Sequence, residues 1–348
     1  MLSTSGYAAR SPTSPLEPFS FVRRAVGSHD VLIRIRYCGI CHSDVHQARD
    51  EWGGSIFPMV PGHEIVGTVR QVGSAVTGFA IGDLAGVGCF VDSCRVCTQC
   101  RLGLEQYCDG HLVLTYNGTE RDQQTPTYGG YSDQIVVDER YVLRIPPDLR
   151  LEGAAPLLCA GITTYSPLRH WDVGKGQRLG VVGLGGLGHM AVKIGAALGA
   201  EVSVLSHSAH KRQDAARLGA ADFILTSDSS ALAKLDRRFD VMIDTVSASH
   251  DLDGYLNTLK TDGTMILVGA PSRPMPVGAF PLLLRRRRLV GSLIGGIRET
   301  QEMLDFCAKH RMAADVEVIP IQEVNRAYER LLRGDVRYRF VIDLASLT

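Results

Sequence analysis

The sequence lacks an excess of charge of either sign. Its 37 lysine and arginine residues balance 37 aspartate and glutamate residues, which gives a formal net charge of +0 at pH 7. A chain of this kind has no global field that would draw it to nucleic acid or to an anionic membrane surface. The longest run of like charge is four arginines at residues 285–288. We interpret this run as a solvated helix face or turn, because no basic and aromatic surroundings accompany it.

Long apolar runs are absent as well. No stretch is long and uniform enough to span a bilayer, and residues 1–18 are rich in Ser, Thr and Pro without the apolar core of a secretory signal. The nine cysteines are an odd number, and four of them fall within residues 94–108. We therefore expect metal ligation in a reducing cytoplasm rather than a disulfide framework.

With 348 residues, the chain is longer than one hydrophobic core comfortably supports, so we expect two domains. Residues 1–154 contain short strands, at 31–36 and within 64–73, separated by frequent glycines, which predicts a small irregular barrel. From residue 155 to 291, strands alternate with helices, which predicts βαβ units and a parallel sheet covered on both faces. The fold class is therefore α/β.

The second region can be divided into individual elements. Apolar runs predict strands at residues 178–182, 201–205, 223–225, 241–244 and 264–268. The segments between them predict helices at residues 189–198, 211–218 and 252–259. The last part of the chain predicts two helices and a terminal strand, at residues 299–309, 323–332 and 338–344.

A glycine-rich segment follows the first of these strands and precedes a helix, as in a dinucleotide-binding loop. Gly183 would allow the tight turn, Gly185 the approach of a pyrophosphate, and Gly188 the packing of helix on strand. The helix N-terminus offers free N–H groups to phosphate, whereas a turn without a ligand is the alternative. We expect cofactor contacts from all six residues of the loop: Gly183, Leu184, Gly185, Gly186, Leu187 and Gly188.

The end of the second strand lacks an acidic residue. NAD sites usually place Asp or Glu about 20 residues past the glycines, where it bonds the ribose hydroxyls. No acid occurs between Val202 and Gln213. Hydroxyl and cationic groups, which attract a 2′-phosphate, predict NADP(H) contacts from Ser206, His207, Ser208 and Lys211. An ordinary polar loop that caps a helix is the alternative.

Four cysteines have the spacing of a closed metal site: Cys94, Cys97, Cys100 and Cys108. Four thiolates so close in sequence can surround one tetrahedral Zn²⁺ and leave no position open, which predicts a structural zinc lobe at about residues 89–110. Disulfides, free core cysteines and a zinc knuckle for nucleic acid are the alternatives, and the neutral charge argues against the last of them.

Three short motifs resemble the signatures of the zinc-containing medium-chain alcohol dehydrogenases. They are Gly-Ile-Cys-His-Ser-Asp at residues 39–44, Pro-Gly-His-Glu at 61–64 and Leu-Cys-Ala-Gly at 158–161. The resemblance runs from about Val22 to the end of the chain. The most similar branch, that of cinnamyl alcohol dehydrogenases and bacterial NADP-dependent aldehyde reductases, shares residues 88–94, 103–108 and 129–132.

This resemblance implies an open catalytic zinc site, because it joins three residues that no local spacing rule connects: Cys41, His63 and Cys159. Two thiolates and one imidazole leave zinc a fourth position for water or substrate. A zinc so held polarises an aldehyde carbonyl or lowers the pKa of an alcohol. Hydride then passes between the substrate carbon and C4 of the nicotinamide.

Further roles in catalysis follow from the same resemblance. Ser43 would start a proton relay that continues through the cofactor ribose to His46. Asp44 would orient His63, and Glu64 would approach the metal during ligand exchange. For Asp44 and Glu64, buried hydrogen-bonded residues without a catalytic role are the alternative.

The resemblance also implies contacts with cofactor and substrate. His42 would lie near the pyrophosphate, and five positions would line the nicotinamide half of the site: Thr163, Thr245, Gly269, Ser292 and Ile294. Trp52 matches an aromatic wall of the substrate pocket, with core packing as the alternative. His207 and His210 interrupt the branch's usual run of Ser and Lys, so a softer or pH-dependent preference for NADP is the alternative to a strict one.

The resemblance implies a GroES-like catalytic domain, formed by residues 1–154 and 292–348, and a Rossmann domain at 155–291. It also implies a homodimer that pairs through residues 289–294. We expect a cytoplasmic enzyme that interconverts primary alcohols and aldehydes, aromatic or medium-chain, with two zinc ions and NADP(H). The alternatives are a zinc-free quinone or enone reductase of the same architecture and a non-enzymatic NADP-binding protein. Either would lack the open zinc site.

Overall fold

The chain enters one unit, passes through a second and returns to the first. The computed structural model describes residues 1–228, 230–271 and 273–347. One unit contains Met1–Ile162 and Gly295–Thr348, and the other contains Thr163–Ile294. The boundaries expected from the sequence, at residues 155 and 291, lie slightly earlier. The first division falls inside helix α4 (Ala160–His170), which begins in one unit and continues into the other.

The unit of residues 163–294 is built on a parallel sheet of six strands, in the order β12-β11-β10-β13-β14-β15. Strands such as β10 are almost wholly buried, as parallel strands covered on both faces are. The bounds are β10 (Arg178–Val182), β11 (Glu201–Ser206), β12 (Asp222–Leu225), β13 (Phe239–Asp244), β14 (Leu259–Leu267) and β15 (Arg288–Gly291). The strand order is that of a doubly wound dinucleotide-binding fold.

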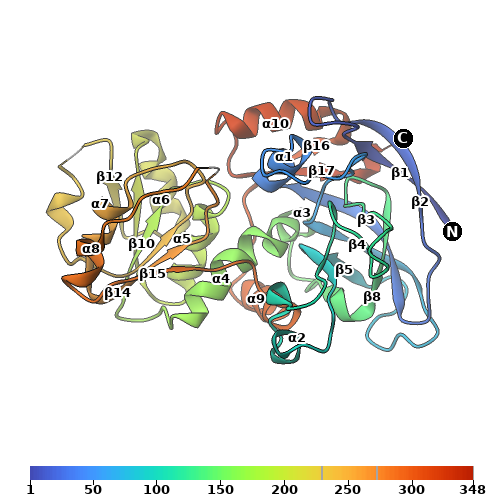
Figure 1. Ribbon diagram of the computed structural model, residues 1–348, viewed down its shortest axis with the longest axis horizontal. Coiled ribbons are helices and arrows are strands. Elements are labelled where there is room, and N and C mark those ends of the chain that lie inside the picture. Colours follow the sequence, from blue (N-terminus) through green and yellow to red (C-terminus); the bar gives the residue numbers. More distant parts are fainter. Residues whose placement is uncertain (229, 272, 348) are drawn as a thin grey trace. The chain divides into compact units, whose positions relative to one another are not determined.

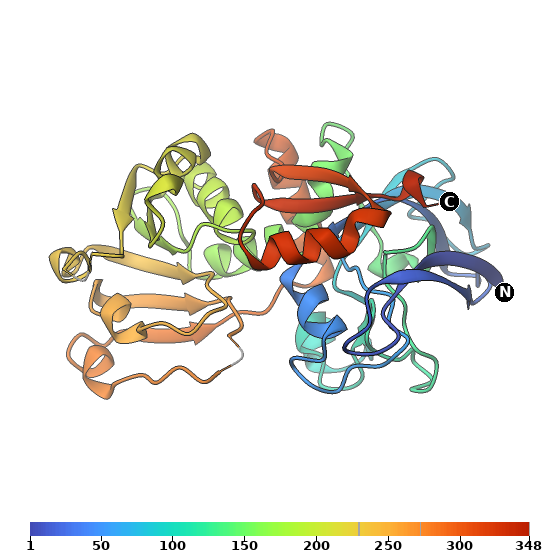
Figure 2. The ribbon, with the colours of Figure 1, turned by 90° about the horizontal axis from the view of Figure 1, so that it is seen from above.

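Four further helices connect these strands: α5 (Gly188–Ala197), α6 (Arg212–Leu218), α7 (Leu252–Leu256) and α8 (Ala279–Leu283) (Figures 1 and 2). Helix α5 contacts α6, and α7 contacts α8. Right-handed crossovers that lead outward in opposite directions from β10 and β13 place the two helix pairs on opposite faces of the sheet. The strand order reverses between β10 and β13, so the loops after these two strands border the crevice in which such a sheet binds its ligand.

The other unit is built around a sheet of seven strands, in the order β16-β17-β3-β4-β5-β9, with β8 beside β3. The bounds are β3 (Asp30–Ile40), β4 (Ile65–Val72), β5 (Leu84–Val87), β8 (Gln134–Asp138), β9 (Leu143–Arg144), β16 (Val316–Pro320) and β17 (Arg339–Asp343). Strand β17 runs antiparallel to β3, with Phe340 opposite Ile40. The C-terminal tail is therefore part of the sheet that the N-terminal part begins (Figure 1).

Short helices and small strand pairs complete this unit. The helices are α1 (His42–Ala48), α2 (Thr98–Leu102), α3 (Leu151–Ala154), α9 (Ile297–Lys309) and α10 (Val324–Leu332). Two small antiparallel strand pairs accompany them. The pair later in the chain is β6 (Phe90–Asp92) with β7 (Val113–Leu114). The first pair, β1 (Leu2–Ala8) and β2 (Glu17–Arg23), is an antiparallel hairpin that the sequence did not lead us to expect. Among the described residues, none of the helices combines the length and the apolar character needed to cross a bilayer.

The four arginines at residues 285–288 are not a uniformly solvated run, and this expectation was wrong for Arg287. Its buried guanidinium donates to the carbonyl oxygens of Leu259 at 2.9 Å and Asn257 at 3.1 Å. These two carbonyls lie at the C-cap of α7 and at the first residue of the following strand, and the side chain of Arg287 satisfies them there. Helix α7 ends at Leu256, earlier than expected, and β14 begins at Leu259, earlier than expected.

Candidate metal and cofactor sites

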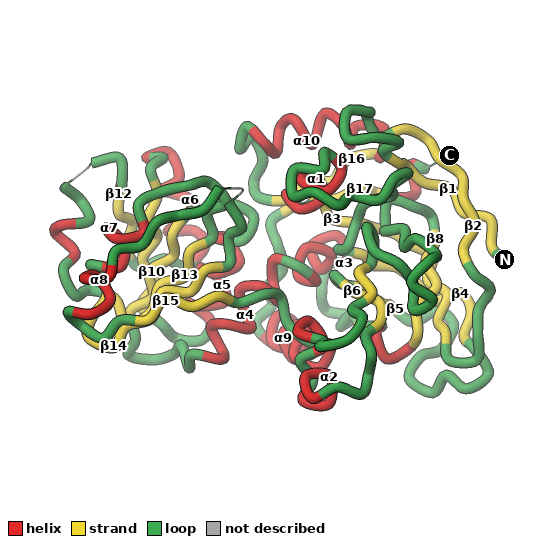
Figure 3. Tube along the Cα trace, in the orientation of Figure 1, coloured by secondary structure: helices red, strands yellow, loops and turns green. Residues whose placement is uncertain are grey.

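The closed cluster is formed by the four cysteines predicted for it. The ligand atoms of Cys94, Cys97, Cys100 and Cys108 all lie within 4.8 Å of one another. Most of this segment is loop around the short helix α2 (Figure 3). The Sγ atoms of Cys97 and Cys100 are 3.5 Å apart, and those of Cys94 and Cys100 are 3.9 Å apart. Four thiols at this separation fit a tetrahedral zinc ion without further ligands.

Two backbone N–H groups stabilise the thiolate form of one cysteine in the closed cluster. The N–H groups of Val96 and Cys97 point at Cys94 Sγ and lower the pKa of Cys94 to about 6. Burial raises the pKa of Cys108. Because a metal binds the thiolate, the cluster has one ligand that is already deprotonated at neutral pH.

The open cluster joins Cys41, His63, Glu64 and Cys159, whose ligand atoms also lie within 4.8 Å of one another. All four residues are buried, and Cys41 Sγ is 3.9 Å from Cys159 Sγ. Cys41 follows β3 and is the N-cap of α1, while His63 and Glu64 immediately precede β4. The antiparallel pairing of β3 with β4 therefore brings residues 41 and 63 together.

Asp44 stands behind the open cluster. It is completely buried, and its Oδ1 atom is 3.4 Å from Nδ1 of His63. Its other oxygen accepts the N–H of Cys41 at 2.8 Å, which is one half of a capping box at the start of α1. The pair with Asp44 raises the pKa of His63 against the opposing effect of burial, which is the largest single influence. The carboxylate thus touches His63 as the predicted orienting role requires.

Glu64 has a partner that sequence reasoning did not find. Arg339 of β17 donates to Glu64 Oε1 in a pair in which both side chains are buried, at 2% and 0% exposure. Within the described part of the chain, Glu64 Oε2 has no hydrogen-bond partner although it is buried. An unsatisfied carboxylate oxygen among two thiols and an imidazole fits a cation there, since buried polar atoms are otherwise nearly always paired. The chemistry of the donor set suits zinc.

Cys89 is a second residue that sequence reasoning missed. Its thiol is in hydrogen-bond contact with Cys159, and its charge is the largest raising influence on the pKa of His63. As a whole residue, Cys89 is partly exposed, whereas Cys41 and Cys159 are buried. No spacing rule marks an isolated cysteine of this kind, and the pairing with Cys159 exists only in three dimensions.

The predicted relay residues are divided between the cluster and the surface. Ser43 Oγ is 3.6 Å from Cys41 Sγ. His46 Nδ1 is 2.5 Å from Glu51 Oε2, and its ring stacks on Trp52 at 4.8 Å. Trp52 is 41% exposed, so part of its indole faces away from the protein core. His42 is partly buried, and this burial lowers its pKa.

The glycine-rich loop has the surroundings that the motif requires. Gly183 has a φ of 87°, and a Cβ atom there would lie 2.8 Å from Val246. A Cβ at Gly188 would overlap with the carbonyl of Gly183, so the first turn of α5 must pack closely on the loop. A Cβ at Gly185 would meet nothing within 4 Å, which leaves the backbone open to a ligand. The loop can therefore present N–H groups to a phosphate.

The residues predicted to bind the 2′-phosphate lie around the end of β11. Ser206 is buried and accepts the N–H of Ser208 at 3.3 Å. Lys211 Nζ donates to the carbonyl of Leu184 at 2.9 Å, which places this cation beside the glycine-rich loop. Burial lowers the pKa of Lys211. His207 is exposed at the same edge.

The predicted nicotinamide contacts lie in different parts of the chain. Thr245 follows β13 and donates from Oγ1 to Val182 at 2.8 Å, and Gly269 approaches Val246 so closely that a Cβ would overlap with it. The other three positions lie elsewhere in the chain. Thr163 is a buried residue of α4, and Ser292 and Ile294 follow β15. The roles of these positions and of the relay remain predictions.

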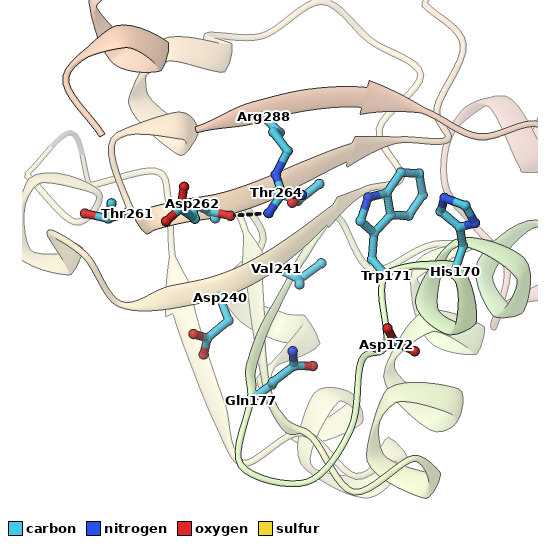
Figure 4. A pocket seen from close by; sticks show the side chains of 11 residues that line it. His170, Trp171, Asp172, Gln177, Asp240, Val241, Thr261, Asp262, Thr264 and Arg288 are labelled. Atoms are coloured by element: carbon cyan, nitrogen blue, oxygen red, sulfur yellow. Dashed lines mark hydrogen bonds between the residues drawn. The ribbon is translucent and has the colours of Figure 1, made fainter. Parts of the chain in front are cut away.

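The amino ends of the parallel strands, at the end of the sheet away from the glycine-rich loop, border a hollow of about 620 Å³ (Figure 4). None of the predicted site residues lines it. Two of its charged side chains already have partners within the protein. Asp240 bonds Lys260 at 2.7 Å, and Arg288 donates to the carbonyl of Asp262 at 2.8 Å. Trp171 and His170 line the other side (Figure 4). We therefore assign cofactor binding to the carboxyl ends of the strands, where the glycine-rich loop lies, as the strand order requires.

Comparison with known proteins agrees with both units. A profile described as the alcohol dehydrogenase GroES-like domain matches residues 27–147, and one described as zinc-binding dehydrogenase matches residues 186–309. NADP-dependent alcohol dehydrogenase C 1 of Mycolicibacterium smegmatis is 58% identical over 348 residues, 100% of this chain and 99% of that protein. The aldehyde reductase YahK of Escherichia coli is 55% identical and covers 98% of both chains.

Solved structures show the same likeness. A cinnamyl alcohol dehydrogenase from Sorghum bicolor has a TM-score of 0.97 and 47% identity, over 100% of this chain and 99% of that one. CAD from Helicobacter pylori, complexed with NADP(H), has a TM-score of 0.94 and 44% identity over the same shares. The chain belongs to the zinc-binding alcohol dehydrogenase family, which confirms the predicted family, fold class and zinc-dependent oxidoreductase activity.

Proposed function

We propose that this chain catalyses reversible hydride transfer between NADP(H) and primary alcohols or aldehydes. The open cluster is the observation that carries the proposal. Two thiols, one imidazole and the carboxylate of Glu64 bring ligand atoms within 4.8 Å of one another in the protein interior, and among the described residues Glu64 Oε2 has no hydrogen-bond partner. A zinc ion bound there would polarise the reacting oxygen of the substrate. Cys41, His63 and Cys159 would hold it, and the fourth position would remain for the substrate.

The other residues of the site would position groups and move a proton. Ser43 Oγ lies next to Cys41 and would accept the proton that an alcohol loses. His46 would exchange that proton with solvent through Nε2, because its Nδ1 atom is bonded to Glu51. Glu64, fixed by Arg339, would stand in for the departing ligand when the substrate exchanges.

NADP(H) is the proposed cofactor because the end of β11 carries hydroxyls and cations. We expect kcat/KM to be at least about tenfold higher with NADPH than with NADH, since a 2′-phosphate gains charge-assisted bonds there. Ser208→Asp should reduce or reverse the preference, whereas the matched variant Ser208→Ala should change it little. Equal kcat/KM for the two cofactors in the wild type would refute this assignment.

Aromatic and medium-chain aldehydes are the proposed substrates. Trp52 is partly exposed and stacks on His46, so its indole is accessible to an aromatic group. Trp52→Ala should lower kcat/KM for cinnamaldehyde and benzaldehyde by about tenfold and for short aliphatic aldehydes much less, as loss of an aromatic contact predicts. Equal losses for both classes would show that Trp52 is a packing residue rather than part of the substrate pocket.

The metal content separates this proposal from its two rivals. A zinc-free quinone or enone reductase and a non-enzymatic NADP-binding protein would both lack a bound metal at the open cluster. We expect one zinc in each of the two clusters. Elemental analysis that finds one zinc or none per chain would favour a rival, and turnover of enones without alcohols would identify the reductase.

We further propose a cytoplasmic homodimer. In the part of the chain that the structure describes, none of the nine cysteines forms a disulfide bond, which suits a reducing compartment. Strand β15 is an edge of its sheet, and in the connection that leads to it helix α8 and its C-cap residue Leu284 expose apolar side chains: Phe280, Leu283 and Leu284 are 71% to 75% exposed. Exposed apolar groups beside an open edge favour pairing of two copies. Light scattering should give twice the chain mass, and the variant Val290→Lys on that edge should be monomeric. A monomeric wild type would exclude the dimer.

A further inference from the structure

Asp44 is a buried carboxylate that other groups must hold in place. Within the described part of the chain it has no lysine or arginine partner, and its ion pair is with His63. A buried charge is tolerated when hydrogen-bond donors surround it. The N–H of Cys41 donates at 2.8 Å and the N–H of Gly62 at 3.2 Å. Both donors belong to residues that are, or adjoin, proposed zinc ligands.

A third donor is a side chain from a distant segment. The hydroxyl of Tyr131 donates to Asp44 Oδ2 at 3.2 Å, and Tyr131 is 0% exposed. The backbone of Tyr131 is fixed to the segment that carries His63, because its N–H donates to Pro61 O at 3.0 Å. The hydroxyl is therefore held against the carboxylate by the same pairing that positions the imidazole.

A second tyrosine continues this chain of hydroxyls. Tyr328 of α10 is buried, and its hydroxyl donates to the oxygen of Tyr131 at 3.5 Å. Helix α10 contacts α1, which carries Asp44, and Arg49 pairs with Glu329 between the same two helices at 2.6 Å. Successive hydrogen bonds polarise one another, so the hydroxyl of Tyr328 makes that of Tyr131 a stronger donor to Asp44.

We propose that Tyr131 and Tyr328 are positioning residues of the open cluster, which act through Asp44 on His63 and slow the loss of zinc. The inference rests on the proposed function, because it requires zinc at this cluster. Asp44 meets His63 at Nδ1, which leaves Nε2 for the metal. A carboxylate that keeps its place therefore keeps the imidazole in its place. Phenylalanine at either tyrosine would preserve the ring and remove only the hydroxyl.

The test is the release of zinc to a chelator from purified full-length protein. The phase that disappears in Cys159→Ala reports the open cluster, and the phase that disappears in Cys108→Ala reports the closed one. Tyr131→Phe should release open-cluster zinc about tenfold faster, the lower end of the effect of removing a group behind a metal ligand. Tyr328→Phe should release it about threefold faster. The double variant should match Tyr131→Phe alone, because Tyr328 acts through Tyr131.

Tyr141→Phe is the matched control. Tyr141 is a buried tyrosine of the same unit whose hydroxyl lies 2.8 Å from Ser93 Oγ, beside the closed cluster. Its loss should leave the release from the open cluster unchanged.

Three results would overturn the inference while the proposed function stands: an unchanged open-cluster phase in Tyr131→Phe, equal acceleration of both phases, or additive effects in the double variant. A wild-type protein that holds no zinc at the open cluster would overturn both.

Discussion

The closed and open clusters contain similar ligands but are assembled in different ways. The closed cluster takes its four thiols from residues 94–108, a single loop around α2. The open cluster takes Cys41, His63 and Cys159 from three segments, and its carboxylate is held by Arg339 near the end of the chain. The proposed structural metal site can thus be encoded by local spacing, whereas the proposed catalytic metal site requires the folded unit.

The two clusters also differ in what they leave unsatisfied. Four thiols complete the coordination of one zinc ion, so the closed cluster has no place for a substrate. The open cluster offers two thiols and an imidazole, and its carboxylate has one oxygen, Glu64 Oε2, that finds no hydrogen-bond partner among the described residues. The open cluster therefore leaves a coordination position for a reacting group, whereas the closed cluster contributes only to the stability of the fold. Substitutions in the two clusters should therefore have different consequences.

The largest expected effect is on activity, in Cys159→Ala. Under the proposed function, loss of this thiolate removes a ligand of the catalytic metal, whose polarising effect is worth several kcal/mol. We expect kcat/KM to fall by about a thousandfold or more. Zinc content should fall to one per chain while the closed cluster keeps its metal. Activity within about tenfold of the wild type would contradict a catalytic role for the open cluster.

Arg339→Met tests whether the open cluster depends on the distant tail. The variant leaves the carboxylate of Glu64 unpaired in the interior, which should lower the free energy of unfolding by about 3–5 kcal/mol. Denaturant unfolding at neutral pH measures the loss. The double variant with Glu64→Gln removes the stranded charge and should recover most of the stability. A loss below about 1 kcal/mol, or a double variant no more stable than the single one, would show that the pair contributes little.

Cys108→Ala should affect the closed cluster alone. Because a structural zinc contributes folding energy directly, the unfolding temperature should fall by about 5 °C. The activity of the protein that remains folded should stay close to that of the wild type at low temperature. Differential scanning calorimetry and zinc analysis measure both properties. Unchanged zinc content with unchanged thermal stability would mean that this cluster does not hold a metal.

The smallest expected effect distinguishes the thiols after the metals are removed. The pKa of Cys94 is lowered to about 6 by backbone N–H groups. Its thiolate, the reactive form, therefore persists above that pH and is lost as the pH falls through it. In chelator-stripped protein, alkylation of Cys94 should show a midpoint near this pKa, whereas burial should keep Cys159 unreactive. Mass spectrometry of the labelled peptides would contradict this if Cys159 reacted first.

Local patterns were sufficient for one part of the molecule. Strand β10 was predicted with its observed bounds, Arg178–Val182, because its apolar run and the glycines after it lie within a dozen residues. The closed cluster was predicted for the same reason. Both signals depend on residues that are neighbours in the sequence, and their geometry follows from the backbone between them.

Long-range contacts were not available from the sequence. The N-terminal hairpin was missed because its first strand, β1, is hydrogen-bonded to residues near Tyr131, far along the chain. In the sequence, Arg287 is one of four consecutive arginines and was predicted to be solvated. Its buried bonds to the carbonyls of Asn257 and Leu259 form only when β14 and β15 lie side by side in the sheet. The partners Arg339 and Cys89 were missed for the same reason. Cys41, His63 and Cys159 were joined through resemblance to a family, since no spacing links them.

The most direct test of this account is to remove zinc from the open cluster and return it. Native mass spectrometry of the purified chain should show two zinc ions, one for each cluster. Mild chelation should remove the open-cluster zinc with all of the activity, and one equivalent of zinc should restore both. Full activity in protein that has lost the open-cluster zinc, or a chain that never binds a second zinc, would contradict the central claim.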